Sequence, residues 1–512
     1  MIMKANNNDS LSKRYFYKLS TGLISLPIQL IIQSIVPRSL GPVAYGQFAF
    51  LTNSFAQIIS FFDSGVSYAY YTKLSGNLNN RGLISYFFKL ILFLTIVVVL
   101  GTSGIILLKL DAYIWPDQKV MFIYMALFWA LINFYSATIN KTIDAFGLTS
   151  TGELIKIGQK IFSLVLILGL YFFLRIDLFS FFLYHYVIMI FLIIGGLVLL
   201  KRNGVSLLKS YALAKNQVKE LTNYFWSYSS PMITYSFVSM IVGLLDYWFL
   251  QKFSGSSQQG YFGLSFRIAS ICFIFTGAMT PLITREFSVA FSNKNIPKMR
   301  SLFVKNIPLL YTIAAAISVF LCLQANTVTQ IIGGEKFKEA GLAVALMTLY
   351  PIHQTYGQLS GSVFYATGQT KLYRNIGVSM MVSGLIVSFF LIGPQKFYGL
   401  DLGALGLVIK MLVMQFTLVN IQLFFNSKYL NLNFKKFVGH QFLIVISFFI
   451  LAYIAKCFST LAFENNLLSF LLSGTIYLIF ILVLLYNFPV LISIKKNKIT
   501  EMLIILSKKI KK

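Results

Sequence analysis

Four ionisable residues of this sequence lie inside long apolar runs, where a charge is costly. They are Asp63, Asp246, Arg267 and Lys410. A charged side chain at mid-membrane costs roughly 2.5–3.5 kcal/mol on insertion scales, so each of the four needs a partner, a polar cavity or a ligand. The neighbours of Arg267 on both sides are apolar, which favours a guanidinium that faces a polar lumen.

The other three residues also have simpler explanations. Asp246 and Lys410 lie near the ends of their runs, so their side chains could reach water along their own length. Asp63 could cap a helix break before Gly65 and bind nothing else. These alternatives stay open at the level of the sequence.

Further candidates lie near the ends of the apolar runs. Lys156 and Lys160 share one helical face with Glu153, and Arg285 ends another run. They are either ordinary interface residues or a basic vestibule that receives an anionic head group. His353 is the histidine best placed to face a cavity, and neither the three histidines nor the three cysteines have the spacing of metal ligands. No metal or other cofactor is therefore expected.

The elements that must position these residues are membrane-spanning helices. Hydrophobic residues make up 57% of the 512 residues and charged residues only 11%, too few to cover a soluble surface of this size. Apolar runs of about 20 residues recur along the chain without the period-two alternation of a barrel strand. We expect an all-α polytopic membrane protein with about fourteen spans, near residues 15–37, 47–69, 84–108, 119–140, 154–174, 179–200, 224–250, 260–283, 306–325, 341–366, 375–393, 403–426, 438–457 and 467–488.

The distribution of Lys and Arg predicts the orientation. Loops on the side of the termini carry more than twice as many basic residues as the opposite loops, so both termini are expected in the cytoplasm. This bias accounts for most of the net charge of +28. Nucleic-acid binding would need that charge on one soluble face, and none is expected.

The sequence also suggests a division into lobes. We expect an N-terminal six-helix lobe (1–200), a basic cytoplasmic linker (201–223), a C-terminal six-helix lobe (224–426), an accessory helix pair (427–490) and a basic amphipathic tail (491–512) that lies on anionic lipids. The two lobes resemble each other weakly, with Pro27 and Pro231 early in their first spans and Tyr45 and Tyr261 opening their second spans. Parallel repeats of this kind would place a transport path between them.

One loop motif resembles that of a known family. Residues 38–46 read RSLGPVAYG, and the similarity rests on Arg38, Leu40, Gly41, Pro42, Tyr45 and Gly46. Residues 62–66, 259–268 and 365–371 agree more weakly, in the expected order. The pattern resembles bacterial polysaccharide flippases, the Wzx-type branch of the multidrug/oligosaccharidyl-lipid/polysaccharide exporter (MOP) superfamily, which move O-antigen or capsule repeat units.

The resemblance implies a V-shaped transporter without enzymatic activity in the bacterial cytoplasmic (inner) membrane. Its cargo would be an undecaprenyl-diphosphate-linked oligosaccharide, moved by alternating access, with a polysaccharide polymerase as a possible partner. Asp63 and Asp246 would couple transport to H⁺ or Na⁺. Arg267 would bind the diphosphate through its planar donor fork, with Lys410, Arg285, Lys156 and Lys160 as further cations. The sugar would contact polar and aromatic residues, among them Gln29, Gln33, Asn53, Tyr235 and His353.

Two other classes fit less well. A cation or multidrug exporter of the same superfamily needs buried acids, whereas the deep charges here are balanced or basic. A membrane polysaccharide polymerase or ligase usually carries its catalytic residues on a sizeable external loop, and no predicted outer loop much exceeds fifteen residues.

Overall fold

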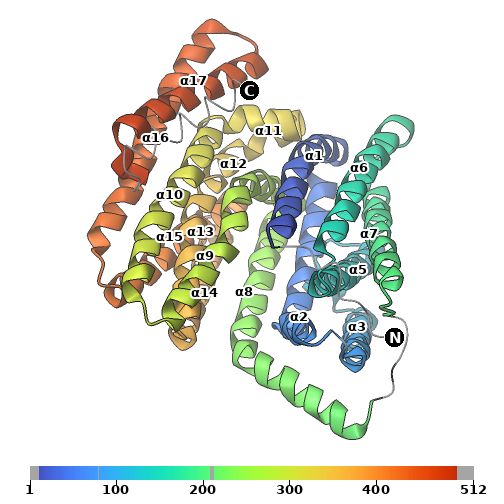
Figure 1. The fold of residues 1–512 in the computed structure, drawn as a ribbon. Coiled ribbons are helices and arrows are strands. Elements are labelled where there is room, and N and C mark those ends of the chain that lie inside the picture. The colour runs from blue at the N-terminus through green and yellow to red at the C-terminus, as the bar shows by residue number, and fades with distance from the viewer. Residues whose placement is uncertain (1–10, 79, 208–210, 212, 493–512) are drawn as a thin grey trace. The chain divides into compact units, whose positions relative to one another are not determined.

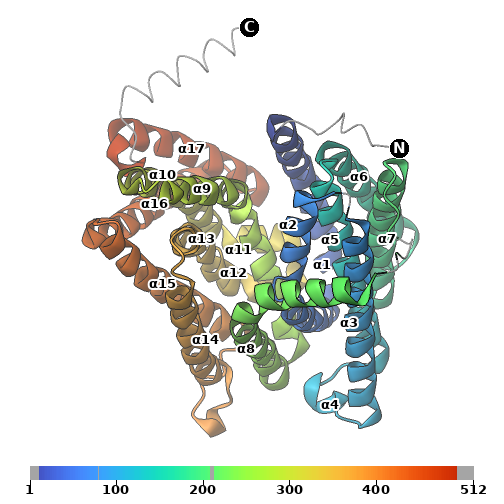
Figure 2. The same ribbon diagram turned by 60° about the horizontal axis from the view of Figure 1, so that its bottom comes forward.

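The computed structural model describes residues 11–78, 80–207, 211 and 213–492, and in this part of the chain every regular element is helical. The helices (Figures 1 and 2) are α1 (Leu11–Asp63), α2 (Val66–Gly76), α3 (Arg81–Leu107), α4 (Asp111–Ile114), α5 (Val120–Ala145), α6 (Thr149–Phe173), α7 (Leu178–Arg202), α8 (Lys215–Ala269), α9 (Ile274–Ser292), α10 (Ile296–Leu323), α11 (Ala325–Gly333), α12 (Gly341–Met347), α13 (Tyr350–Ala366), α14 (Thr370–Ile392), α15 (Gly403–Tyr429), α16 (Phe434–Ala462) and α17 (Asn466–Asn487). The predicted all-α membrane fold is confirmed. Apart from residues 491 and 492, the predicted basic tail lies outside the described residues.

Eleven helical stretches of the described chain are long and apolar enough to cross a membrane. Two of them, Phe16–Asp63 and Met232–Phe273, have 48 and 42 residues, which is twice the length that one crossing needs. Each of these two contains a break at a glycine and so provides two crossings. These two breaks raise the number of crossings from eleven to thirteen. The remaining one is the tenth predicted span, which is divided between α12 and α13, so the helices match all fourteen predicted spans.

The breaks in the two long helices have the same backbone conformation. Gly41 has φ 74° and ψ 172°, and Gly255 has φ 80° and ψ 179°. This region is essentially restricted to glycine, because a Cβ atom would collide with the neighbouring backbone. Gly41 therefore has a structural task in the RSLGPVAYG motif, which is to reverse the chain between two spans.

A reciprocal backbone contact joins the helices that follow these breaks. A Cβ atom on Gly46 would lie 1.8 Å from the carbonyl oxygen of Ser256, and one on Gly260 would lie 2.2 Å from that of Pro42. Each glycine follows its break by five residues, so the structure aligns Gly46 with Gly260. The alignment of Tyr45 with Tyr261 expected from the sequence is therefore displaced by two residues.

The chain forms two compact units, Met1–Gly260 and Tyr261–Lys512. The boundary between these units follows Gly260, which packs on Pro42 of α1. The V-shaped arrangement and the lobe boundaries proposed from the sequence stay predictions.

Helices α1, α5, α6 and α7 form most of the core of the first unit (Figure 1). Phe50, Phe55 and Phe182 are fully buried there, and Tyr70 stacks on Phe87 at 4.0 Å between ring centroids. In the second unit α10, α13, α15 and α16 surround a core that includes the buried Phe303, Tyr311, Tyr356 and Phe448. Both units therefore have interiors of their own that can hold functional side chains in place.

We expect Gly46→Ala to destabilise the protein. The added methyl group would overlap backbone atoms that cannot move without separating two helices, and overpacking of this kind typically costs about 1–3 kcal/mol. The melting temperature of the detergent-solubilised protein measures the effect. Gly104→Ala is the matched control, since nothing lies within 4 Å of a Cβ atom there. Equal melting temperatures for the two variants would contradict the contact.

Candidate functional site

Asp63 ends α1 at a second break in the same membrane crossing. Ser64 has φ 33° and Gly65 has φ 84°, so the helix cannot continue through them, and α2 starts at Val66. The backbone N–H of Ser67 donates to Asp63 Oδ1 at 2.9 Å, and the Ser67 hydroxyl donates to Oδ2 at 2.7 Å. The carboxylate thus caps the new helix, as the capping alternative from the sequence proposes. Its role in ion coupling stays a prediction.

Lys141 of α5 completes the charge balance at this break. Its ammonium donates to the Ser67 hydroxyl and interacts electrostatically with Asp63. The ammonium also lies 4.4 Å from the ring centroid of Tyr68, a cation–π contact. Asp63, Ser67 and Lys141 therefore form one hydrogen-bonded chain that connects α1, α2 and α5.

A cavity of about 280 Å³, lined by apolar and polar side chains, opens beside Asp63. Ser60 and Asp63 of α1 line one wall, and Trp129 and Asn133 of α5 line the other. The indole Nε1 of Trp129 is buried and has no hydrogen-bond partner among the described residues. An exchanging water or hydroxyl group in the cavity would meet a carboxylate, an amide and a hydroxyl, which together can carry a proton or bind a sugar hydroxyl.

Lys141, Trp129 and Asn133 were not predicted from the sequence. Lys141 lies one residue beyond the predicted end of its span, so it resembled an interface residue, whereas the helix extends to Ala145. Trp129 and Asn133 belong to an apolar run and carry no motif. The signal available in the sequence was the spacing of Trp129, Asn133 and Ala137, which marks one face of a helix.

The two predicted deep cations have opposite environments. Arg267 of α8 is exposed, and its guanidinium has no hydrogen-bond or ion-pair partner in the described part of the chain. Lys410 of α15 is only 8% exposed, and its Cε atom lies against Gly384 of α14. Lys410 therefore does not extend to the surface, which was the simpler explanation for it.

The predicted basic vestibule is partly paired. Lys156 forms an ion pair with the buried Glu153 at 2.8 Å, and Lys160 on the same face is half-buried. Arg285 of α9 is exposed, while its neighbour Glu286 pairs with Lys298 at 3.4 Å. Lys156 thus has a structural partner that a ligand would have to compete with.

The remaining predicted residues are divided between the two units. Gln29, Gln33, Asn53, Tyr235 and Asp246 lie in the first unit, and all five are half-buried. The Asn53 amide donates to the carbonyl oxygen of Ala49 in its own helix at 2.8 Å.

Two predicted residues retain unused hydrogen-bonding atoms. Gln33 Oε1 is buried and has no partner within the described residues. The same is true of Nδ1 of His353, which lies in the second unit between the rings of Tyr311 and Phe416. Both atoms are thus available to a ligand or to water.

Four acidic side chains of the first unit have cationic partners. Asp144 pairs with Lys18 at 3.0 Å, Glu153 with Lys156, and Glu220 with Lys73 at 3.4 Å. Asp63 is held by Ser67 and Lys141, and Asp246 also has an interaction partner. None of these acids offers a free negative charge to a cationic cargo.

Solved structures with the same fold are transporters. A lipid II flippase, MurJ, in an inward closed conformation matches with a TM-score of 0.69 and 12% identity, covering 93% of this chain and 99% of its own. An inward-facing multidrug resistance MATE transporter matches at 0.64 with 14% identity, covering 82% and 99%. A MOP superfamily transporter from Pyrococcus furiosus, described as having a binding pocket of reverse polarity, matches at 0.56 with 13% identity, covering 83% and 97%.

The fold is that of the MOP superfamily transporters. No protein-family model and no curated protein matches the sequence. The predicted superfamily fold is thereby confirmed, and the neighbours are transporters and flippases, not enzymes. These structural similarities do not identify the polysaccharide branch of the superfamily.

We expect the Asp63–Lys141 pair to show coupling in a double-mutant cycle. Lys141→Met leaves the Asp63 carboxylate without its cation, and Asp63→Asn leaves the ammonium unpaired, so each single variant should melt at a lower temperature than the wild type. The double variant removes both charges and should lose less than the sum, with a coupling of about 0.5–3 kcal/mol. Strictly additive losses in melting experiments would mean that the two groups do not interact.

Proposed function

We propose that this protein is a flippase that moves undecaprenyl-diphosphate-linked oligosaccharide repeat units across the bacterial cytoplasmic membrane by alternating access. Both termini would lie in the cytoplasm, and the product would pass to a polysaccharide polymerase. Coupling to H⁺ or Na⁺ through Asp63, with Asp246 as a second acid, would drive the cycle. This proposal adds a substrate and a direction of transport to what the fold shows.

The charge balance carries this proposal. Asp144 and Glu153 of the first unit form ion pairs, whereas the exposed guanidinium of Arg267, in the second unit, has no protein partner in the described chain. A cation exporter would need the opposite, a free carboxylate within its spans. An arginine fork suits a diphosphate, because two parallel N–H donors match its oxygens.

The fold comparison supports a lipid-linked cargo in a second way. The lipid II flippase covers 93% of this chain, and the MATE transporter covers 82%. The structure with the wider match is thus the one described as a flippase of a lipid-linked molecule. A multidrug exporter remains the alternative, because its fold also covers most of the chain.

Complementation tests the cargo and the cationic site together. In a bacterial strain that lacks its polysaccharide flippase, we expect the wild-type protein to restore surface polymer. Arg267→Ala should lower the polymer about 10- to 100-fold, since a hydrogen bond to a charged group contributes about 1.5–3 kcal/mol. Arg267→Lys should retain part of the activity, and Arg175→Ala, in an exposed loop, should be neutral.

Two other outcomes would contradict the role of Arg267 or the proposed cargo. Full activity of a well-expressed Arg267→Ala variant would remove this residue from the site. Efflux of cationic dyes by cells that carry the wild-type protein, without restored polymer, would support the multidrug alternative.

Ion coupling is tested in vesicles with an imposed ion gradient. We expect wild-type flipping to slow when the gradient is collapsed, and Asp63→Asn to flip slowly with or without the gradient. The Asn side chain keeps the size of the cap but cannot exchange a proton or hold a cation. Asp177→Asn, at an exposed cap of α7, should behave as the wild type. A gradient response that persists in Asp63→Asn would contradict the coupling role.

A further inference from the structure

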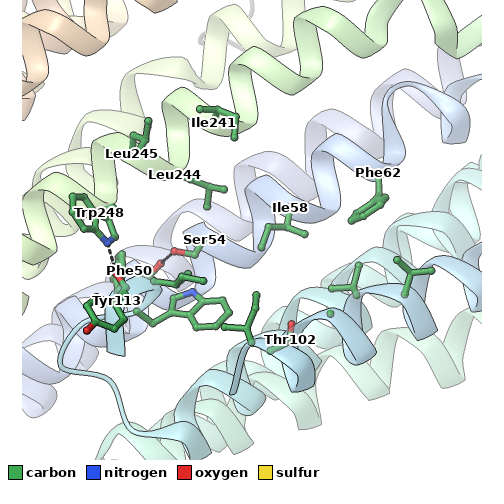
Figure 3. A pocket seen from close by; sticks show the side chains of 16 residues that line it. Phe50, Ser54, Ile58, Phe62, Thr102, Tyr113, Ile241, Leu244, Leu245 and Trp248 are labelled. Atoms are coloured by element: carbon green, nitrogen blue, oxygen red, sulfur yellow. Dashed lines mark hydrogen bonds between the residues drawn. The ribbon is translucent and has the colours of Figure 1, made fainter. Parts of the chain in front are cut away.

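The first unit contains an apolar slot whose lining includes none of the polar residues proposed to act in transport. It has a volume of about 610 Å³ and lies between the second half of α1, the end of α3 and the middle of α8 (Figure 3). The α1 wall consists of Phe50, Ser54, Ile58 and Phe62, spaced four residues apart. These positions form one stripe along the helix, about 18 Å long at 1.5 Å per residue.

The interior of the slot offers nothing to a sugar or a phosphate. The Ser54 hydroxyl donates to the carbonyl oxygen of Phe50 at 2.8 Å and is therefore satisfied within its own helix. No charged side chain lines the slot, and its lining includes no buried side-chain atom that lacks a hydrogen bond, as far as the described residues extend. Only hydrocarbon can gain from entering such a space.

One end of the slot has the character of a membrane surface. The indole Nε1 of Trp248 donates to the carbonyl oxygen of Tyr113 at 2.7 Å (Figure 3). Trp115, which follows Tyr113 by two residues, also lines the slot. Trp and Tyr concentrate where hydrocarbon meets the head groups. From this end the slot extends about 18 Å, slightly more than half of a hydrocarbon core of roughly 30 Å. Its length suits one extended chain within one leaflet.

We propose that this slot binds the polyisoprenoid chain of the lipid carrier while the polar cargo crosses the membrane. The inference rests on the proposed function, because it assigns a place to the apolar part of that cargo. The same half of α1 that carries the apolar stripe carries the polar residues Ser60 and Asp63 on its roughly opposite face, where they line the second cavity. One helix thus presents both surfaces that an amphiphilic molecule needs.

Filling the slot provides the test. Gly101 of α3 lines it, and nothing lies within 4 Å of a Cβ atom at that position, so Gly101→Phe places a ring in the open space. Gly104 lies on the same helix, also has free space, and does not line the slot, so Gly104→Phe is the matched control. Both variants are compared with the wild type as the full-length protein in detergent.

The probe is undecaprenyl phosphate, with phosphatidylglycerol as the competing bilayer lipid. We expect Gly101→Phe to weaken binding of undecaprenyl phosphate about tenfold, and Gly104→Phe to leave it unchanged. A photoactivatable polyprenyl phosphate should label residues 97–105 or 241–248 in the wild type and not in Gly101→Phe. Phosphatidylglycerol at equal concentration should not prevent this labelling.

Three results would overturn the proposal. They are unchanged binding in Gly101→Phe, equal losses in both variants, or labelling that phosphatidylglycerol abolishes, which would make the slot a site for ordinary bilayer lipid. Failure here is distinguishable from failure of the proposed function. If the wild type restores surface polymer but Gly101→Phe binds the carrier normally, only the slot is refuted. If the slot captures the carrier but no polymer is restored, the slot stands and the oligosaccharide function fails.

Discussion

The structure depends on the requirement that every backbone N–H and C=O group within the hydrocarbon is hydrogen-bonded inside the protein. Long helices satisfy it, and each interruption must be compensated by other groups. At Gly41 and Gly255 the chain reverses between two crossings. At Ser64 and Gly65 it breaks inside a crossing, and there the carboxylate of Asp63 takes up the N–H of Ser67 that the break leaves without a helical partner. Lys141 and the cavity of about 280 Å³ lie at this compensated break.

The negative charge of Asp63, which compensates the backbone break, creates a second requirement. Asp63 in an apolar surrounding needs a counter-charge, and Lys141 provides one from α5. The same pairing recurs at Asp144 and Glu153. Arg267 is different because no described protein group neutralises it. Under the proposed function, this guanidinium would bind an anion without competition from a described carboxylate, and that distinguishes the proposal from a cation exporter of the same fold.

The sequence predicted the number and position of the spans because hydrophobic length is a property of single segments. The break at Gly41 was also predictable, since glycine and proline in residues 38–46 mark a loop. The pairing of Gly46 with Gly260 was not, because the aromatic neighbours of the two glycines suggested a register displaced by two residues. Lys141 escaped notice because a partner on another helix gives no local signal. The slot was hidden for the same reason, as its walls come from segments up to 198 residues apart, from Phe50 to Trp248.

The second half of α1 explains why one crossing can serve two chemistries. Its successive i, i+4 positions from Phe50 to Phe62 are apolar or internally satisfied, and the roughly opposite face carries Ser60 and Asp63. In a soluble protein such a helix would place its apolar face in the core and its polar face in water. In a membrane both faces must be covered, the apolar one by hydrocarbon and the polar one by protein, water or cargo. A helix with cavities on both faces is therefore incompletely covered by its own protein, and each face leaves room for a molecule of matching polarity.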